Sequence, residues 1–390
     1  MTKFNIFKMR SYKILFATNW LIFMLGDAYA SPPLQDATVP SFSEGIFVDN
    51  NKNVYVASYN SVTDIIKFSD HGDIKSVAVG KCESTSCPRY RQVAYRPDLG
   101  WCIPGGIAFD GKNIFLANSE NSGILKINSS GRVSRLAGSG AWGFANSQNP
   151  LAAKFSLDNS VQYDPKGSPF LAFPGLAVDH DGNLYISDSG NQVIRKIATN
   201  GSVLTVAGHP GRFGFSDGSG ESAYFNHPAG LVIDGSNNIF VADEGNNTIR
   251  RIAPNGSVST LAGLANAAGG FADGVGGNAR FNHPIGLAMD PRGNILVTDS
   301  GNFRVRLVSP NGTVRTIIGP EKLMFGVGKP DLNTGFLRAP SAIAVDSDGS
   351  IYVTNAWRHQ VSKYSADGSK ILWEKSTHLD PLPDGLFDIY

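Results

Sequence analysis

The stretch PGLAVDHDGNLYISDSGNQVIRKIATNGSVLTVAG, from Pro174 to Gly208, decides the fold because five other parts of the chain repeat it. Two close copies follow it, PAGLVIDGSNNIFVADEGNNTIRRIAPNGSVSTLAG from Pro228 to Gly263 and PIGLAMDPRGNILVTDSGNFRVRLVSPNGTVRTIIG from Pro284 to Gly319. Weaker copies begin at Glu44 (EGIFVDNNKNVYVAS), Pro104 (PGGIAFDGKNIFLANS) and Pro340 (PSAIAVDSDGSIYVTN). A period of roughly 40 to 50 residues with several short strands in each unit is typical of repeat architectures.

Each copy predicts four short strands. In the quoted copy these are GLAVD, NLYISD, VIRKI and SVLTVAG, which are rich in Val, Ile, Leu and Tyr and too short for helices. Between them stand DHDGN, DSGNQ and ATNG, whose Asp-Gly and Asn-Gly pairs suit tight turns between antiparallel strands. One such sheet cannot bury both of its faces, but sheets packed around an axis can. We therefore predict an all-β protein, a six-bladed β-propeller of four-stranded antiparallel blades.

The repeated pattern resembles the NHL repeat family. Its elements are Pro-x-Gly-hydrophobic-Ala-hydrophobic-Asp, then Gly-Asn-hydrophobic, then Asp-x-x-Asn-x-x-(Ile/Val)-Arg, and together they cover about residues 43–376. The resemblance implies a six-bladed propeller with the GLAVD-type strand innermost and the SVLTVAG-type strand outermost. The sixth copy departs from the pattern at Ser341-Ala342 and at residues 355–359, and the first two copies lack the Asp and the Arg.

The N-terminus predicts export. Basic residues precede the apolar run ILFATNWLIFML, which is followed by Ala28-Tyr29-Ala30. This order is typical of a cleavable secretory signal, and the alternative of a membrane anchor is disfavoured because Ile14 to Leu25 is short for a bilayer. We expect cleavage after Ala30 and a secreted or periplasmic protein with no stable membrane anchor. The expected parts are a signal peptide (1–30), a linker (31–42), the propeller (43–376) and a C-terminal tail (377–390).

Charge and cysteine content narrow the functional classes. The chain has 34 Lys and Arg against 33 Asp and Glu, so no bulk attraction to nucleic acid is expected. The three cysteines, Cys82, Cys87 and Cys102, lie between the first and second copies at a spacing unlike the close pairs of zinc sites. In an oxidising compartment we predict one disulfide among them and one free thiol, with the pairing left open. Three unlinked thiols, the alternative, would conflict with the signal sequence.

The long connections between copies all join the outermost strand of one blade to the innermost strand of the next. They span 80–104, 138–174, 208–228, 263–284 and 319–340. In an antiparallel four-stranded blade, this connection lies on the same face as the turn between the second and third strands. We therefore expect one loop-rich face, around the mouth of the axial channel, and one face with only tight turns. Insertions confined to one face commonly mark the binding face of a repeat protein.

Non-repeated residues on the loop-rich face are the predicted ligand contacts, since aromatic and adaptable polar side chains are typical of recognition surfaces. They are Tyr59, Glu120, Trp142, Glu244, Phe303, Trp357, Arg358 and His359. For each aromatic residue, the alternative is packing between blades.

An acid and a base also recur seven residues apart, and recurrence in three blades favours structural ion pairs over catalytic pairs. These are Asp188 with Arg195, Asp243 with Arg250, and Asp299 with Arg306.

Two loops share a phrase that could hold a metal ion. DGSGESAYFNHP begins at Asp217 and DGVGGNARFNHP begins at Asp273, so the metal candidates are His227, His283, Asp217 and Asp273. The alternative is an ordinary turn whose Phe225 and Phe281 cover the gap between blades, and recurrence favours it. At the other blade entrances Ala339, Phe173 and Ile103 precede the proline. We therefore predict no cofactor, with Ca²⁺ or Zn²⁺ as the alternative.

The functional prediction is a binding module. The chain has no nucleophile elbow, phosphate loop or paired-cysteine metal motif. Propellers of similar architecture include peptidyl-hydroxyglycine amidating lyases, gluconolactonase-like metal hydrolases and streptogramin lyases, but their catalytic residues do not match this sequence position by position. Fold alone does not define an activity. We expect an exported propeller that binds a protein, peptide or glycan on its loop-rich face. The alternatives are a metal-assisted lyase or lactonase-type hydrolase at the channel mouth, and a structural module of an envelope assembly.

Overall fold

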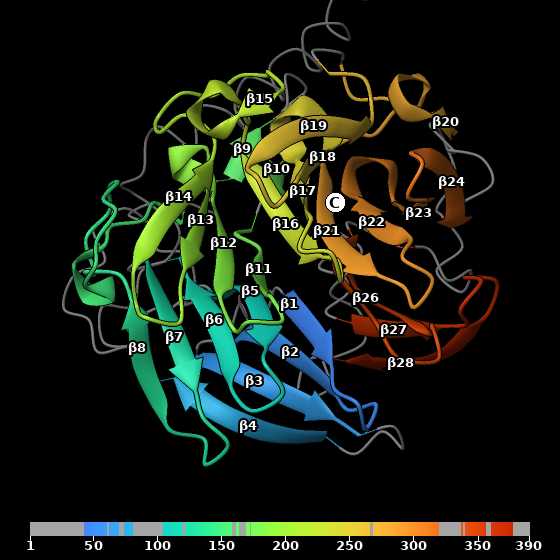
Figure 1. Cartoon of the computed structure of the whole chain (residues 1–390). Coiled ribbons are helices and arrows are strands. Elements are labelled where there is room, and N and C mark those ends of the chain that lie inside the picture. The colour runs from blue at the N-terminus through green and yellow to red at the C-terminus, as the bar shows by residue number, and fades with distance from the viewer. Residues whose placement is uncertain are drawn as a thin grey trace, which may run out of the picture. The chain divides into compact units, whose positions relative to one another are not determined.

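The computed structural model describes the chain from residue 43 to residue 376 with gaps (Figure 1). The described ranges are 43–60, 62–69, 74–80, 104–119, 122–157, 161–163, 169–171, 173–265, 268–319, 337, 340–355 and 360–376. All of them belong to one unit of the chain, residues 40–390. In these ranges the regular structure consists of strands and short 3-10 turns.

Six antiparallel sheets form the blades, and in each the strands pair in chain order, as predicted. Blade 1 is β1 (Ser43–Val48), β2 (Val54–Asn60), β3 (Val62–Phe68) and β4 (Ile74–Gly80); blade 2 is β5 (Pro104–Phe109), β6 (Ile114–Asn118), β7 (Gly123–Ile127) and β8 (Val133–Ala137). Blade 3 is β11 (Leu176–Val178), β12 (Leu184–Asp188), β13 (Val193–Ile197) and β14 (Val203–Ala207); blade 4 is β16 (Pro228–Ile233), β17 (Ile239–Asp243), β18 (Thr248–Ile252) and β19 (Ser257–Ala262). Blade 5 is β21 (Pro284–Met289), β22 (Ile295–Asp299), β23 (Arg304–Val308) and β24 (Thr313–Ile318); blade 6 is β25 (Pro340–Val345), β26 (Ile351–Asn355), β27 (Gln360–Tyr364) and β28 (Ile371–Ser376).

Three short additions were not predicted. The loops before blades 4 and 5 each return to the edge of the next sheet as a fifth strand. These strands are β15 (Gly218–Ser219), which pairs with β19, and β20 (Gly274–Val275), which pairs with β24. The loop before blade 3 contains a separate hairpin of β9 (Val161–Tyr163) and β10 (Pro169–Leu171). Two residues of pairing carry no hydrophobic alternation, so sequence periodicity does not reveal them.

The core lies between neighbouring blades. The second strands of blades 2 to 6, β6, β12, β17, β22 and β26, are buried along their whole length. Each is an unbroken run of mostly apolar side chains because both faces of its sheet are covered. Blades 1 and 6 join in the same way, through a cluster that contains Ile46, Val56, Tyr352 and Val361. The ring therefore closes between two four-stranded blades, and within residues 43–376, where the structure describes them, neither blade borrows a strand from the other.

The repeated glycine of the innermost strand marks the closest approach of two blades. A Cβ atom on Gly175 would lie 2.7 Å from the carbonyl oxygen of Ala229 and 2.7 Å from the amide nitrogen of Leu231, both in the next blade. The Gly175 amide donates a hydrogen bond to that same oxygen at 3.2 Å. Gly106, Gly230 and Gly286 meet a carbonyl of the following blade in the same way. The recurrent Gly of the motif thus allows backbone to pack against backbone around the axis.

The face opposite the long inter-blade loops has the predicted tight turns between first and second strands. Each of these turns is stabilised by an aspartate. Asp179 Oδ1 accepts hydrogen bonds from the amides of Asp181 and Asn183, and Asn183 Nδ2 donates to Asp179 Oδ2 at 2.8 Å. Burial raises the pKa of Asp179, but hydrogen bonds from Asn183 and Tyr185 outweigh this effect and lower the pKa. Equivalent turns begin at Asp49, Asp110, Asp234, Asp290 and Asp346. The aspartate at the end of the innermost strand therefore stabilises the tight turn that follows it.

We expect the change Gly175→Ala to destabilise the propeller by about 1–3 kcal/mol, because the new methyl group overlaps the backbone of blade 4. The matched control is Gly235→Ala, at an exposed turn where a Cβ meets nothing within 4 Å. Urea unfolding of the two variants and the parent measures both effects. Equal stability of the two variants would contradict this account of the repeated glycine.

Candidate ligand-binding face

The turns between second and third strands lie against the long inter-blade loops, as the strand order predicts. These turns are η2 (Ser189–Asn191), η4 (Glu244–Asn246) and η6 (Ser300–Asn302). The last residue of each turn donates a side-chain hydrogen bond to a loop carbonyl at 2.8 Å. The pairs are Asn191 with Gly143, Asn246 with Gly214, and Asn302 with Gly270. Turns and loops together form what we call the loop-rich face of blades 3 to 5.

A buried arginine holds the loop before blade 4. Arg250, on β18, pairs through Nη1 with Asp243 Oδ2 at 2.7 Å, and neither side chain is exposed. The same nitrogen donates to the carbonyl of Tyr224 at 3.0 Å. Nη2 donates to the carbonyl of Ser216 and to Asp217 Oδ1, both at 2.8 Å. One guanidinium group therefore joins the blade to both ends of the loop segment from Ser216 to Tyr224.

The same arrangement, which we call the arginine clasp, recurs in blades 3 and 5. Arg195 bonds Asp188, Lys154, Ala145 and Asn146, and Arg306 bonds Asp299, Arg280, Ala272 and Asp273. Each guanidinium also lies over two phenylalanine rings, at 4.6–5.2 Å from their centroids. These rings are Phe144 and Phe155, Phe215 and Phe225, and Phe271 and Phe281. Stacking and planar hydrogen bonding together suit arginine and not lysine.

Burial dominates the electrostatics of the clasp. Burial raises the pKa of Asp243 to about 6, against the opposing effects of Arg250 and of a hydrogen bond from Asn246. Burial also raises the pKa of Asp188 and of Asp299. In all three blades the other oxygen of the carboxylate, Oδ1, accepts a hydrogen bond from a loop amide, that of Ser156, Asn226 or Asn282. The Asp and Arg seven residues apart therefore form the buried ion pairs that the recurrence favours.

The two loop aspartates named as metal candidates are part of the clasps. Asp217 and Asp273 are about half exposed, at 48% and 47%, and their carboxylates accept hydrogen bonds from Arg250 and Arg306. Each also accepts bonds from the threonine of the neighbouring outer strand, Thr260 or Thr316. Among the residues that the structure describes, no three His, Cys, Asp or Glu side chains form a group that could hold a metal ion.

The two histidines occupy equivalent backbone positions with different surroundings. His227 and His283 have φ values of 50° and 51°, and their amides donate to side-chain oxygens of Gln192 and Asn247 in the preceding blade. His283 Nδ1 also contacts the carboxylate of Glu244. Glu244, predicted as a surface contact for a ligand, is in fact buried, with 2% of its side chain exposed, whereas the His283 ring is 20% exposed.

The structure places two other predicted contacts at the surface of this face. Trp142, in the loop before blade 3, is 37% exposed, and Phe303, directly after η6, is 40% exposed. Phe303 takes the left-handed position that Gln192 and Asn247 occupy in the two preceding blades. The side chain of Tyr59, a residue of β2, lies outside the described residues. So do Glu120, Trp357, Arg358 and His359, and the cysteines Cys82, Cys87 and Cys102.

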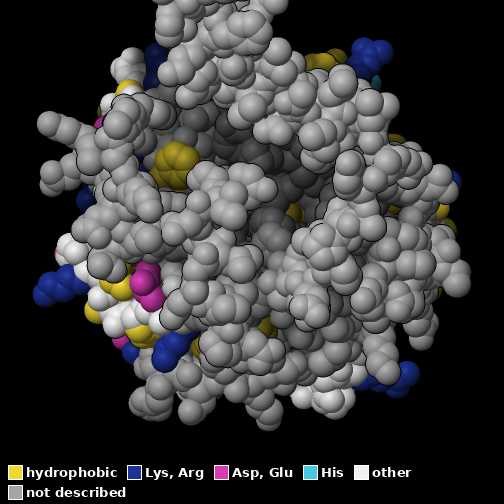
Figure 2. Space-filling view, turned by 180° about the vertical axis from the view of Figure 1, so that it is seen from behind, with side chains coloured by type: hydrophobic (Ala, Val, Ile, Leu, Met, Phe, Trp, Pro, Cys, Tyr) yellow, Lys and Arg dark blue, Asp and Glu magenta, His cyan; other side chains and the backbone are white. Residues whose placement is uncertain are grey.

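Sequence reasoning missed the exposed phenylalanines of the loops. Phe213 is 74% exposed, Phe271 is 44% exposed and Phe144 is 37% exposed. A repeated signal was present, because Gly-Phe-(Ala/Ser)-(Asn/Asp) stands at residues 143–146, 214–217 and 270–273. Trp142 and Phe213 both directly precede the glycine of this motif, so the two exposed aromatic residues occupy equivalent places. In Figure 2, described hydrophobic side chains reach the surface at several separate places.

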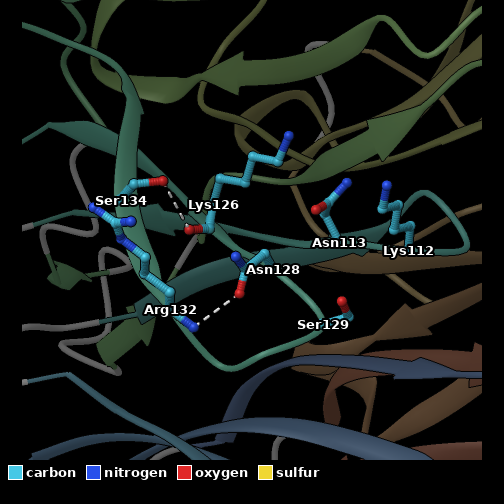
Figure 3. Close-up of a pocket in the computed structure, with 7 residues that line it drawn as sticks. All are labelled: Lys112, Asn113, Lys126, Asn128, Ser129, Arg132 and Ser134. Carbon is cyan, nitrogen blue, oxygen red and sulfur yellow. Dashed lines mark hydrogen bonds between the residues drawn. The ribbon is translucent and has the colours of Figure 1, made fainter.

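A groove on blade 2 lies away from these loops (Figure 3). It is formed by the turn between β5 and β6 and the turn between β7 and β8. Its lining residues are Lys112, Asn113, Lys126, Asn128, Ser129, Arg132 and Ser134. Asn128 Oδ1 accepts a hydrogen bond from the Arg132 amide at 2.9 Å. The groove is basic because Lys112, Lys126 and Arg132 line it. It lies on the tight-turn face.

Replacing Arg250 tests the clasp. We expect Arg250→Met to cost about 3–5 kcal/mol of unfolding free energy, because Asp243 is left as a buried carboxylate without its cation. Hydrogen exchange should also accelerate at the amides of residues 214–218, which the clasp holds. The matched control is Arg315→Met, at an exposed arginine of the outer strand β24, which should change stability by no more than about 0.5 kcal/mol. Similar losses in the two variants would refute the role given to the clasp.

No helix in the described parts of the chain has the length and apolar character needed to cross a membrane.

The family model for the NHL repeat matches residues 225–252, 281–306 and 337–364. Human NHL repeat-containing protein 2 is 27% identical over 276 residues, which cover 66% of this chain and 38% of that protein. Zebrafish (Danio rerio) teneurin-3 is 30% identical over 229 residues, which cover 53% of this chain and 8% of that protein. The chain thus spans well under half the length of these curated relatives.

Solved structures share the fold. A protein of unknown function from Bacteroides thetaiotaomicron superimposes with a TM-score of 0.53 at 18% identity, over 85% of this chain and 70% of that one. A streptogramin B lyase superimposes with a TM-score of 0.49 at 14% identity, over 89% and 86% of the two chains. The first of these likenesses, at 18% identity, shows the fold alone. The matched NHL repeats thus lie in blades 4, 5 and 6 of a six-bladed β-propeller.

Proposed function

We propose that this propeller is a binding module that engages a protein, peptide or glycan through its loop-rich face. We further propose that it acts outside the cytoplasm, secreted or periplasmic, after removal of residues 1–30. NHL propellers generally mediate protein interactions, which supports the first part of the proposal. The basic run, the apolar segment and Ala28-Tyr29-Ala30 support the second part.

One observation carries the proposal: loops fixed by buried arginine clasps present exposed aromatic side chains on one face. Phe213, 74% exposed, lies between Gly208 and the clasp contacts of Ser216 and Asp217. Trp142, 37% exposed, has the equivalent place before blade 3. Aromatic side chains on a fixed loop lose little conformational entropy on binding, and they are enriched among the residues that dominate binding energy.

The different side chains at one equivalent loop position favour recognition over simple scaffolding. The clasp repeats with the same geometry in blades 3, 4 and 5, but the residue two places before the clasp phenylalanine changes from Trp142 to Phe213 to Gly269. The ring therefore keeps one mechanical design while its outermost side chains differ. Variation on a constant frame is how repeat proteins achieve specificity for a partner.

Binding to glycan and peptide arrays by purified protein of residues 31–390 tests the proposal. For any bound probe, we expect Phe213→Ala and Trp142→Ala to weaken binding by about 2 kcal/mol, a factor of roughly 30. The matched control is Leu204→Ala, at a 43% exposed residue of the outer strand β14 beside a tight turn, which should bind normally.

Hydrogen exchange with the bound probe separates the two faces. Protection should fall on the loops at 139–147, 209–217 and 264–274. Protection confined to the tight turns, such as that from Asp179 to Asn183, would overturn the assignment of the binding face, as would normal binding by both aromatic variants.

A further inference from the structure

A lysine on the third strand recurs in several blades, and it packs on its own sheet wherever a tyrosine lies opposite. This lysine is Lys67 in blade 1, Lys196 in blade 3 and Lys363 in blade 6, each in register with a tyrosine of the second strand. Each ammonium nitrogen lies 5.0–5.4 Å from the centroid of that tyrosine ring. The tyrosine hydroxyl donates a hydrogen bond to the aspartate of the tight turn, at 2.9–3.2 Å. In these three blades the lysine, the ring and the turn therefore support one another.

Lys126 of blade 2 departs from this arrangement. It is in register with Phe115, which has no hydroxyl group to bind the turn aspartate, Asp110. In the described part of the chain, Lys126 forms no salt bridge and lies over no aromatic ring. Burial raises the pKa of Asp110, but hydrogen bonds donated by Asn113 and the charge of Lys126 are among the effects that lower it overall. Lys126 thus lies near one carboxylate without being paired with it.

The unpaired ammonium group faces the groove of blade 2, which we call the basic groove. In the view of Figure 3, Lys126 lies between Lys112 and Arg132. The groove has a volume of about 440 Å³, within the usual range for small-molecule sites. Its lining also contains the carboxamide of Asn113 and serine hydroxyls, but no carboxylate. The groove therefore offers hydrogen-bond donors and positive charge together.

The other two cations of the basic groove occupy repeat positions that vary between blades. The carbonyl of Arg132 closes the turn between third and fourth strands, and its equivalents in blades 3 to 6 are Ser202, Ser257, Thr313 and Lys370. The amide of Lys112 donates to the turn aspartate, and its equivalents in those blades are Asp181, Ser236, Arg292 and Asp348. Among these described positions, only blade 2 has a cation at both places and on the third strand as well. Variation on a constant frame is typical of binding positions in repeat proteins.

We propose that the basic groove is a second binding site, for a small ligand that carries two or more phosphate or sulfate groups. A guanidinium group donates two parallel hydrogen bonds to such an anion, and lysines add point charges. A tetrahedral anion accepts hydrogen bonds from several directions, which suits donors on two turns and a strand. Three cations exceed the charge of a single such group, so a ligand with more than one fits best. The site lies on the face opposite the loop-rich face and does not depend on the binding function proposed above.

The charges around the basic groove favour a small ligand over an extended anionic surface. Exposed aspartates occupy tight turns of the same face, Asp181 in blade 3 and Asp348 and Asp367 in blade 6. A membrane or a nucleic acid would bring its negative charge against these carboxylates as well, and the whole chain has a net charge of only +1. A ligand that fits between the two turns of blade 2 avoids them.

Titration calorimetry with the purified protein tests the proposal. The probes are fructose 1,6-bisphosphate and a trisulfated heparin disaccharide, with sucrose as the uncharged comparison and inorganic phosphate as the single anion. We expect one or both charged probes to bind, more tightly than inorganic phosphate, and sucrose not to bind. Affinity should fall as salt is raised, because the attraction is between exposed charges.

The repeat itself supplies conservative variants for this test. Lys126→Leu introduces the residue that blade 5 has at this place, Leu307, and Arg132→Ser introduces the residue of blades 3 and 4. Each should weaken binding at least about tenfold, because a charge-assisted hydrogen bond is lost. The matched control is Lys196→Leu, which removes the equivalent lysine of blade 3 and should change affinity by less than about twofold, since no contact to the ligand is lost. If Lys126→Leu fails to fold, Lys126→Gln serves the same comparison.

The proposal is overturned if neither charged probe binds at millimolar concentration, or if Lys196→Leu weakens binding as much as Lys126→Leu. Equal affinity for inorganic phosphate and fructose 1,6-bisphosphate would refute a ligand with several anionic groups. Binding to phosphatidylglycerol vesicles without binding to either small probe would identify a membrane surface and refute a small ligand. Failure of the array screen described above would count against the loop-rich face alone, because these probes are tested on the opposite face.

Discussion

The buried guanidinium of the arginine clasp is the interaction on which the loop-rich face depends. A lone buried ion pair is a poor source of stability, because desolvation offsets much of the attraction. In blade 4, however, Arg250 also bonds Tyr224, Ser216 and Asp217 and lies over two phenylalanine rings. Removing the charge would release a loop as well as a salt bridge. Long loops that would otherwise be costly to order are thereby held in place by the blade that follows them.

Repeated and unrepeated positions have separate tasks in this molecule. Glycines such as Gly175 let neighbouring backbones meet, and aspartates such as Asp179 shape the tight turns. Neither depends on what the protein binds. Trp142, Phe213 and the pair of Glu244 with His283 break the repeat on the loop-rich face. The frame could therefore stay constant while the contacts of the face change.

The structural features that depend on residues close together in the sequence could be predicted from the sequence alone. Alternation of apolar runs with Asp-Gly and Asn-Gly pairs predicted the blades, and the spacing of Asp243 and Arg250 predicted an ion pair. The loop partners of the clasp were not predictable, because Ser216 lies 34 residues before Arg250 in a segment without hydrophobic period. Glu244 and His283 are 39 residues apart and meet only because consecutive blades pack. Glu244 is buried because of that packing, and the sequence around it does not indicate this burial.

Closure of the ring between two complete blades has a consequence for how the chain could be rearranged. Blade 1 begins with its innermost strand at Ser43 and blade 6 ends with its outermost strand at Ser376, as every other blade begins and ends. A peptide joining these ends would be one more inter-blade connection, on the same face as the other five. The order of blades along the gene is thus arbitrary with respect to the fold. Circularly permuted chains, opened in any of the long loops, would contain the same six sheets and the same contacts between them.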